Sequence, residues 1–283
     1  MSSETPPFRF FDLEVARTHR VSPSLLRATF TGPDLDGFAS GGRDQSLSLF
    51  LPHPGQPEPV LPNATDEASW YAAYHQLPDD VRAVMRSYTV REQRCDPGGT
   101  EVDIDFALHP DGGPACRWAE RATPGDRVTV LGPTVEDNAG VRFRPPESTD
   151  WVLIWADETA LPAASAILGW LPAGTQARVW LEVPQAADRV APATEADAEI
   201  VWLVREESRE PRTDRALGAI RAAELPDGTP YSWIAGEAGT VKALRRHLVN
   251  ERKFDRKAVT FVGYWRQGVS EDGLRAEAAA ATE

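Results

Sequence analysis

The sequence predicts two domains of different class: an antiparallel six-stranded β-barrel at residues 1–145, then an α/β domain with a parallel five-stranded sheet at residues 146–283. Three observations predict this division. The first half has short runs in which polar and apolar residues alternate, which is typical of strands with one buried face. The second half has continuous apolar runs separated by helical patterns, which are typical of parallel strands covered on both faces. Between the halves lies "RFRPPESTD", whose paired prolines favour a linker.

The composition is that of a folded protein with two cores. The chain has 283 residues, of which 41% are hydrophobic and 26% are charged, and this argues against overall disorder. With 43 acidic and 30 basic residues the net charge is −13, which disfavours nucleic acid and anionic membranes as partners. No apolar run approaches the roughly 18 residues of a membrane span, and the N-terminus shows no signal-peptide pattern. We therefore expect a cytoplasmic protein. A monomer is expected as well, although these features do not fix the oligomeric state.

Six runs in the first half are expected to form the barrel strands, because each is short and is bounded by turn residues. These runs are "FDLEVARTHRVS", "LLRATFTG", "SLSLFLP", "RSYTVRE", "EVDIDFALHP" and "DRVTVLGP". The Pro-rich stretch from Pro54 to Asp80 is expected to be a surface excursion with a helical turn around "EASWYAAYHQL".

Five runs in the second half are expected to form the parallel sheet, because they are apolar throughout. These runs are "WVLIWA", "ARVWLEV", "EIVWLV", "YSWIAG" and "AVTFVGYW". Helical patterns lie between most of them, as in "TALPAASAILGWL" and "GTVKALRRHLVNER". In the second of these, Val241, Leu244 and Leu248 recur at helical spacing, so we expect them to face the core.

The strand "RSYT" carries a first candidate site. Alternation places Arg86 and Tyr88 on one face and Ser87 and Thr89 on the other. An arginine can bind a phosphate with two N–H groups, and a tyrosine offers a flat surface to a ring. The same residues also fit an edge strand with a solvated arginine. The four residues alone leave both interpretations open.

The segment "HPDGGPACRWAERATPGD" places two glycines and a proline before a short helix. Such a turn leaves backbone N–H groups free at the helix N-terminus, where an anion is favoured. His109 precedes the turn by a few residues and is placed to contact the same ligand. A plain turn and a histidine at a strand end also explain the pattern.

Two motifs in the second half end strands of the predicted sheet. "ADETALPA" follows the first strand and opens a helix, so Thr159 lies where open α/β sheets bind ligands. The dinucleotide fingerprint GxGxxG is absent from this turn. Glu237, in "AGEAGT", follows a later strand, and an acid at either place also fits a helix cap. "GYWRQG" ends the last strand with two aromatic residues, typical of a core or domain interface, and with Arg266.

The two cysteines, Cys95 and Cys116, form no CxxC motif. Neither an iron–sulfur cluster nor a zinc site is therefore expected, and in the cytoplasm no disulfide between them is expected either. No group of residues indicates a general acid, a general base or a nucleophile, so we expect no catalytic side chain and no metal site.

Taken in order, these motifs resemble the siderophore-interacting proteins, which are flavin-dependent ferric-siderophore reductases of the ferredoxin-reductase-like superfamily. The resemblance covers nearly the whole chain, from about residue 9 to residue 272. It implies an FAD-binding barrel followed by an NAD(P)H-binding-like domain. The motifs that carry it are "RSYTVRE", "DIDFALHPDGGPACRWAERATPGD", "ADETALPA", "AGEAGTVKALRRHLVNER" and "GYWRQG".

The resemblance also implies contacts to FAD. The position of Arg86 contacts the phosphates, that of Tyr88 lies against the flavin, and that of Thr89 lies near the polar edge of the flavin. Thr159 matches a position beside the flavin, and Tyr264 and Trp265 match aromatic residues that approach it. The residues expected to bind FAD are Arg86, Ser87, Tyr88, Thr89, Asp105, His109, Gly113, Ala115, Cys116, Thr159 and Trp265.

The implied reaction takes electrons from NADH, NADPH or a reduced ferredoxin and passes them through FAD to a ferric siderophore, which releases Fe(II). Two alternatives stay open: a flavin-dependent NAD(P)H oxidoreductase with a protein or another small molecule as acceptor, and a siderophore- or flavin-binding protein without turnover. Ferric siderophores are frequently anionic, so Arg245, Arg246 and Arg266 are candidate substrate-binding residues. Arg245 and Arg246 cannot face the same way on one helix.

Two positions depart from the family pattern. The family commonly has serine where this chain has Cys116, which removes a hydroxyl donor from the predicted phosphate site. The family often has a glycine directly before the aspartate of "DETALPA", where this chain has Ala156 after Trp155. A methyl group at this position narrows the approach of a dinucleotide to the backbone.

Overall fold

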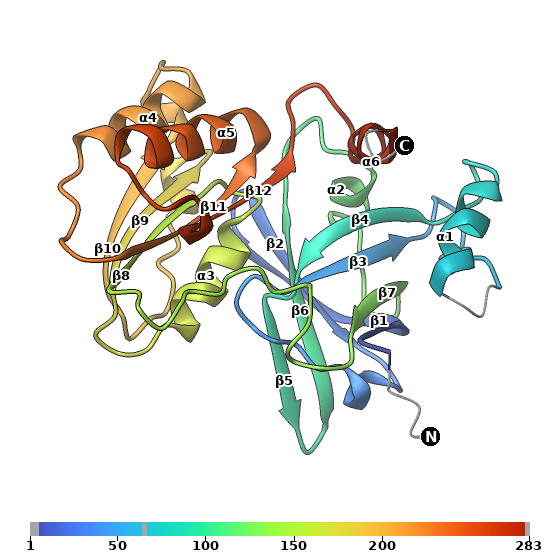
Figure 1. The fold of residues 1–283 in the computed structure, drawn as a ribbon. Coiled ribbons are helices and arrows are strands. Elements are labelled where there is room, and N and C mark those ends of the chain that lie inside the picture. The colour runs from blue at the N-terminus through green and yellow to red at the C-terminus, as the bar shows by residue number, and fades with distance from the viewer. Residues whose placement is uncertain (1–5, 64–66, 281–283) are drawn as a thin grey trace. The chain divides into compact units, whose positions relative to one another are not determined.

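The structure is a computed structural model that describes residues 6–63 and 67–280. This part of the chain forms two compact units, each with its own sheet (Figure 1). Of the described residues, the first unit contains 6–21, 25–63 and 67–140, and the second contains 22–24 and 141–280.

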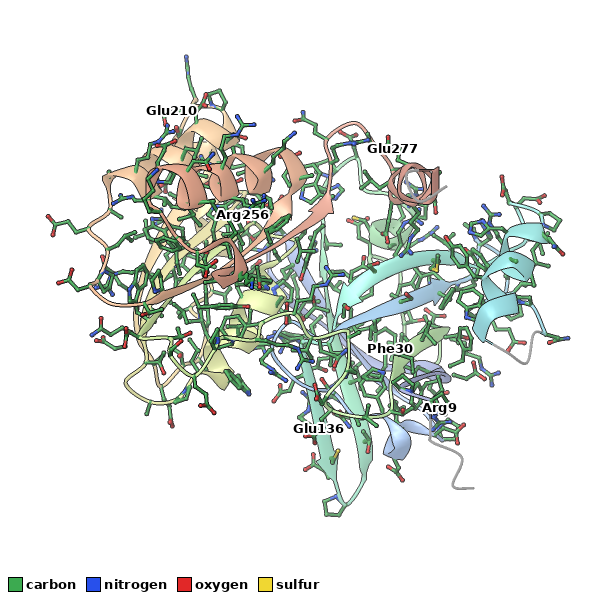
Figure 2. All side chains as sticks on the ribbon, in the orientation of Figure 1. Arg9, Phe30, Glu136, Glu210, Arg256 and Glu277 are labelled. Atoms are coloured by element: carbon green, nitrogen blue, oxygen red, sulfur yellow. The ribbon has the colours of Figure 1, made fainter. Side chains whose placement is uncertain are left out.

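The first unit is built from seven strands. They are β1 (Phe8–Ser22), β2 (Leu25–Thr31), β3 (Ser46–Leu51), β4 (Val84–Thr89), β5 (Glu92–Asp96), β6 (Gly99–Ala107) and β7 (Arg127–Pro133). They form one antiparallel sheet in the order β4-β3-β7-β1-β2-β6-β5. Alternating apolar residues bury one face of this sheet around Phe11, Phe30 and Phe106. Phe30 is labelled in Figure 2.

The prediction of a six-stranded barrel is wrong in two respects, because the sheet has seven strands and is open. The additional strand is β5, whose sequence "EQRCD" has no alternation of polar and apolar residues. Backbone pairing with β6 holds it, from Glu92 opposite Asp103 to Asp96 opposite Gly99. The run "RSYTVRE" therefore contributes to two strands rather than one. Because β4 and β5 are the two edges of the sheet and only two residues separate them in the chain, the sheet has to curl strongly.

Two helices belong to the first unit: α1 (Glu67–Gln76) and α2 (Pro114–Ala119). α1 confirms the helical turn expected in the Pro-rich excursion. Its aromatic residues Trp70 and Tyr74 pack on Phe50 of β3, and the Tyr74 hydroxyl donates to the carbonyl of Ala83 at 2.6 Å. A 3₁₀ turn covers Leu35–Gly37.

The second unit confirms all five predicted parallel strands. They are β8 (Trp151–Ala156), β9 (Gln176–Val183), β10 (Asp197–Val204), β11 (Pro230–Glu237) and β12 (Val259–Trp265). Their order is β10-β9-β8-β11-β12, and every neighbouring pair is parallel. All six residues of β8 are buried, which explains why its sequence has no alternation. The connections from β8 and from β11 run to opposite sides of the sheet, so a topological switch point lies between these two strands.

The helices of this unit are α3 (Leu161–Trp170), α4 (Arg212–Ala222), α5 (Ala238–Arg246) and α6 (Glu271–Ala280). Figure 1 shows α4 and α5 together on one face of the sheet and α3 on the other. The predicted core positions Val241, Leu244 and Leu248 are buried, as expected, in a cluster with side chains of β8 and β11, and α5 packs on β11 and β12. A π-helical turn, His247–Glu251, extends α5, and 3₁₀ turns cover Ala186–Asp188, Arg205–Glu207 and Arg256–Ala258.

No helix within residues 6–63 and 67–280 is long and apolar enough to cross a membrane. Both cysteines are free thiols: Cys95 is exposed and Cys116 is buried. Charged side chains such as Glu210 and Arg256 lie on the outside of the second unit (Figure 2).

Candidate functional site

The first unit brings the two predicted cofactor motifs together. Helix α2 contacts both β4 and β6. Aromatic rings connect the three elements: Tyr88 of β4 lies 4.6 Å from Phe106 of β6, and Phe106 lies 5.8 Å from Trp118 of α2, measured between ring centroids. The strand "RSYT" and the turn "DGGPAC" therefore lie side by side, although the chain between them forms β5 and β6.

The four residues of "RSYT" have different surroundings. Arg86 and Tyr88 are half-buried, Ser87 is exposed and Thr89 is buried. One N–H of the Arg86 guanidinium donates to the carbonyl of Met85 at 2.7 Å. Because β4 is an edge strand, this arginine and this tyrosine lie at the rim of the sheet and not in its middle.

The turn before α2 has the local geometry of an anion site. Gly112 is buried, and a Cβ there would lie 2.2 Å from the Cys116 sulfur, so only glycine fits. Gly113 precedes the helix, and no atom of the described chain lies within 4 Å of the place where its Cβ would be. Gly113 is the N-cap residue of α2 and has an extended backbone, and no side chain makes a capping hydrogen bond there. The first backbone N–H groups of a helix, here at Ala115 and Cys116, have no partner within the helix, and such groups at a turn without a side-chain cap fit a phosphate group.

His109 and Cys116 flank this turn. His109 is exposed, and its carbonyl oxygen accepts hydrogen bonds from the Gly112 N–H at 2.9 Å and from the Cys116 thiol at 3.7 Å. Burial raises the pKa of the Cys116 thiol, so Cys116 stays protonated at neutral pH. The Cys116 thiol therefore acts as a small buried hydrogen-bond donor and not as a nucleophile.

Asp105 belongs to a set of ion pairs on the opposite face of β6. Its carboxylate accepts two hydrogen bonds from Arg27 of β2, at 2.7 and 2.9 Å. We name this set the barrel network. It consists of Arg17, Arg27, Arg94, Glu92, Glu101, Asp103 and Asp105. The structure thus gives Asp105 an internal partner, and a contact of Asp105 with a cofactor stays a prediction.

In the second unit, three predicted motifs converge on Asp157, which follows β8 directly. The backbone N–H and the hydroxyl of Thr159 donate to Asp157 Oδ1 at 3.0 and 2.6 Å. Trp265 Nε1 at the end of β12 and the N–H of Glu237 at the end of β11 each donate to Oδ2 at 2.8 Å. Glu237 also accepts from the Thr240 N–H at 2.8 Å, which confirms the alternative that this acid caps α5.

Asp157 is part of a network of three acids and three arginines, which we name the switch-point network. Its members are Asp157, Glu158, Glu182, Arg205, Arg212 and Arg215. Arg212 is central, because it contacts Asp157 at 3.1 Å and Glu182 at 2.9 Å and lies 4.8 Å from the ring centre of Trp265. Arg205 binds Glu158 with two N–H groups, at 2.5 and 2.7 Å.

Burial dominates the electrostatics of this network. Asp157 and Glu182 are fully buried. Burial, and then the charge of Glu158, raise the pKa of Asp157 to about 6, against the hydrogen bonds from Thr159 and Trp265. Burial also raises the pKa of Glu182, and the charges of the three arginines offset this increase only in part.

The sequence analysis did not select Asp157, Glu182 or Arg212. The sequence could have indicated Glu182, since it is a charged residue inside the apolar run "ARVWLEV". No pattern in the sequence indicates Arg212, because it lies at the start of a helix that the sequence analysis did not predict.

The three candidate substrate arginines lie in separate surroundings. Arg245 is half-buried, with its guanidinium 4.2 Å from the ring centre of Phe261, whereas Arg246 is exposed. Arg266 forms an ion pair with Glu277 of α6 at 2.5 Å. Arg245 and Arg246 thus face different ways on α5, as helical geometry requires.

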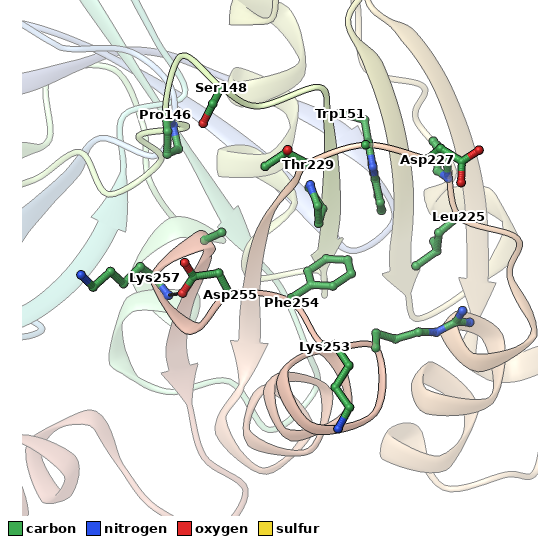
Figure 3. Close-up of a pocket in the computed structure, with 15 residues that line it drawn as sticks. Pro146, Ser148, Trp151, Leu225, Asp227, Thr229, Lys253, Phe254, Asp255 and Lys257 are labelled. Carbon is green, nitrogen blue, oxygen red and sulfur yellow. Dashed lines mark hydrogen bonds between the residues drawn. The ribbon is translucent and has the colours of Figure 1, made fainter.

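A pocket of about 720 Å³ lies at the opposite, amino end of the second sheet (Figure 3). Trp151, Phe254 and Lys253 line it, and Trp151 and Pro230 are the first residues of β8 and β11. Open α/β sheets bind ligands at the carboxyl ends of their strands, so this pocket does not coincide with the convergence on Asp157.

The sequence matches two family models, one in each half of the chain. Residues 14–137 match the siderophore-interacting FAD-binding domain, and residues 149–268 match the siderophore-interacting protein model. Ferric vibriobactin reductase ViuB of Vibrio cholerae serotype O1 is 31% identical over 269 residues, which are 94% of this chain and 92% of that protein. The NADPH-dependent ferric-chelate reductase of Escherichia coli (strain K12) is 32% identical over 260 residues, which are 91% of this chain and 93% of that protein.

Solved structures agree with these matches. A siderophore utilization protein from T. fusca is 35% identical, with a TM-score of 0.77 over 94% of this chain and 96% of that one. The siderophore-interacting protein SipS from Aeromonas hydrophila is 30% identical, with a TM-score of 0.76 over 98% of this chain and 99% of that one. A ferredoxin reductase in carbazole 1,9a-dioxygenase, 16% identical, has the same fold with a TM-score of 0.61 over 93% of this chain and 71% of that one. The chain therefore belongs to the siderophore-interacting protein family.

Proposed function

We propose that the protein is an FAD-dependent oxidoreductase that passes electrons from NADPH or NADH to a ferric siderophore and releases the iron as Fe(II). The observation that supports this proposal is the contact of α2 with β4 and β6, because it brings the strand "RSYT" next to the helix that the uncapped turn at Gly113 begins. This contact lies within residues 14–137, which match the FAD-binding model. Relatives named as ferric-siderophore and ferric-chelate reductases support the same reaction.

Each part of this site suits a different part of FAD. The N–H groups of Ala115 and Cys116 and the guanidinium of Arg86 would bind the phosphates, because both supply donors to an anion. Tyr88 would lie against the flavin ring, and Thr89 would donate to its polar edge. Ser87, Asp105, His109, Thr159 and Trp265 remain further predicted contacts.

Bound FAD supplies the redox chemistry, since it accepts two electrons from a nicotinamide and passes them on singly. The protein binds and orients the cofactor and its substrates. The substrate iron leaves because Fe(II) is a softer ion than Fe(III) and is held less tightly by the hard oxygen ligands of a siderophore. This reaction requires no general acid, base or nucleophile from the protein.

A nicotinamide donor would bind at the carboxyl ends of β8, β11 and β12, where open α/β sheets hold nucleotides. A reduced ferredoxin is the alternative donor. The siderophore, as a frequently anionic complex, would be attracted by Arg245, Arg246 or Arg266. We further propose that the protein acts in the cytoplasm as a monomer.

An anaerobic assay tests the proposed function. Protein loaded with FAD is mixed with NADPH or NADH, then with a ferric tris-catecholate complex and a chromogenic Fe(II) chelator. We expect the flavin absorbance to bleach and Fe(II) to appear. The variant Arg86→Ala should fail for lack of bound FAD, whereas Arg127→Ala, which removes an exposed arginine of the same unit, should behave as the parent.

The other outcomes separate the alternatives. Flavin that bleaches without Fe(II) release indicates an oxidoreductase with a different acceptor. Flavin that only a reduced ferredoxin bleaches identifies the donor as a protein. A colourless protein that binds the ferric complex without turnover would overturn the proposal in favour of a carrier.

A further inference from the structure

The carboxylate of Asp157 connects three strands at the switch point of the second sheet. It accepts five hydrogen bonds: two from Thr159 and one each from Trp265, Glu237 and Arg212. A carboxylate offers about four acceptor positions, so its capacity is fully used. Two of these bonds, from the Thr159 and Glu237 N–H groups, hold the local backbone. The hydrogen bond from the indole of Trp265 does not hold the backbone, because it fixes only the orientation of a side chain.

Trp265 is held in two directions. Its Nε1 donates to Asp157, which fixes the edge of the ring. The guanidinium of Arg212 lies over its face, 4.8 Å from the ring centre. Arg212 is itself held by Glu182 and Asp157, so it cannot turn away without breaking buried ion pairs. The indole is only half-buried, so part of the ring remains accessible.

The indole of Trp265 lies at the carboxyl end of β12, the edge of the sheet at which Asp157 follows β8. β8 and β11 are neighbours in the sheet, and their following connections run to opposite sides. Open α/β sheets bind ligands at the carboxyl ends of such strands. A flat ring fixed there is a stacking surface for a second flat ring. The arginines of the switch-point network equal its acids in number, so the network itself adds no net negative charge to this edge, and Glu237 at the end of β11 contributes one negative charge beside it.

We infer that Asp157 and Arg212 are positioning residues, which hold the indole of Trp265 in one orientation as a stacking surface for the nicotinamide or adenine ring of the electron donor. This inference rests on the proposed function, because it assigns residues that prepare the donor's place in that reaction. The alternative is that Asp157 only holds the turn between β8 and α3, in which case the position of Trp265 is a by-product.

The first measurement uses the indole N–H signal of Trp265 in FAD-loaded, ¹⁵N-labelled protein. Loss of one signal in Trp265→Phe assigns it. In Asp157→Asn we expect hydrogen exchange at this N–H to be at least tenfold faster than in the parent. The control Glu199→Gln removes a carboxylate of the same unit that pairs with Arg178, and it should leave the Trp265 signal unchanged.

The second measurement separates donor binding from the later steps. In Asp157→Asn, the KM for NADPH or NADH should rise at least fivefold while kcat falls less than threefold, because the stacking surface is no longer fixed. Trp265→Phe keeps an aromatic ring, lacks the N–H donor and leaves Asp157 four other donors. It should raise the KM in the same direction, and it serves as the test if Asp157→Asn does not fold.

Either of two results would overturn the inference. Unchanged exchange in Asp157→Asn means that Asp157 does not hold the indole. Faster exchange with a donor KM within twofold of the parent means that the fixed indole is not used in donor binding. A parent protein that neither nucleotide reduces would refute the nucleotide-dependent reaction itself, and the exchange rate would still decide whether Asp157 fixes Trp265.

Discussion

The barrel network and the switch-point network each contain three arginines, paired with four acids in the first and three in the second, yet Glu101 of the first and Asp157 of the second have opposite pKa shifts. In the barrel network, hydrogen bonds from Arg17 and Arg94 lower the pKa of Glu101 to about 2, with burial opposing them. In the switch-point network, burial and the neighbouring Glu158 raise the pKa of Asp157 to about 6.

The pKa values of Glu101 and Asp157 shift in opposite directions because the two acids differ in exposure to water and in the number of acids that share one arginine. The side chains of Arg17 and Glu101 remain 54% and 29% exposed, so solvent stabilises both charges and the arginine favours the ionised acid. Asp157 and Glu182 are completely buried and share Arg212, so each acid competes for the same positive charge. Acids of both networks are therefore perturbed, in opposite directions, so the size of the pKa shift does not separate them. We expect the switch-point network to serve the site because it lies at the carboxyl ends of parallel strands, and the barrel network to serve the fold.

The largest expected effect comes from removing the shared arginine. Arg212→Ala should lower the free energy of unfolding of the second unit by about 3–5 kcal/mol, because it leaves buried carboxylates without their partner. The counterpart Arg94→Ala should cost the first unit about 1.5–3 kcal/mol, since the buried Asp103 keeps Arg27 and Thr29 as partners and the partly exposed Glu101 can be solvated. Urea unfolding is followed by tryptophan fluorescence, to which Trp70 and Trp118 contribute from the first unit and the seven tryptophans beyond residue 150 from the second. Equal losses in the two variants would remove the distinction between the networks.

The pH dependence of stability should show the raised pKa of Asp157. Its folded-state pKa of about 6 lies above its usual value of 3.8, so between these values the folded protein binds more protons than the unfolded chain. The contribution of Asp157 to stability therefore falls as pH rises from about 4 to about 6, by about 2–3 kcal/mol. Measured by tryptophan fluorescence, the parent should lose this amount relative to Asp157→Asn over that range. Parallel curves for the two proteins would contradict the raised pKa.

An arginine outside both networks should affect the cofactor and not the fold. Arg86→Ala should weaken FAD binding by about 1.5–3 kcal/mol, which is about 10–150-fold in Kd, because it removes a charge-assisted contact to the phosphates. Flavin fluorescence quenching measures the Kd, and the unfolding midpoint should stay close to that of the parent. Full flavin stoichiometry with an unchanged Kd would remove Arg86 from the phosphate site.

The smallest effect is expected at Cys116. Its thiol is buried and donates weakly to the His109 carbonyl, so Cys116→Ser supplies a stronger donor in nearly the same volume. We expect FAD to bind as tightly as in the parent or up to about threefold more tightly. If both the melting temperature and the FAD affinity fall clearly, Cys116 acts as a small apolar core residue instead.

Much of this protein follows from local patterns in the sequence. The five strands of the second unit lie where the apolar runs predict them, because parallel strands covered on both faces need continuous burial. The core positions of α5 follow from helical spacing in the same way. The motifs "RSYT" and "DGGPAC" were recognisable because each has its chemistry within a few neighbouring residues.

Only the tertiary structure decided the rest. β5 lacks an apolar pattern, so its pairing with β6 becomes visible only once the sheet exists. Asp157 has partners 55 and 108 residues away along the chain, Arg212 and Trp265. No spacing in the sequence indicates such contacts, because hydrogen bonds depend on distance in space. The direction of a pKa shift depends further on the removal of water, which the complete fold alone determines.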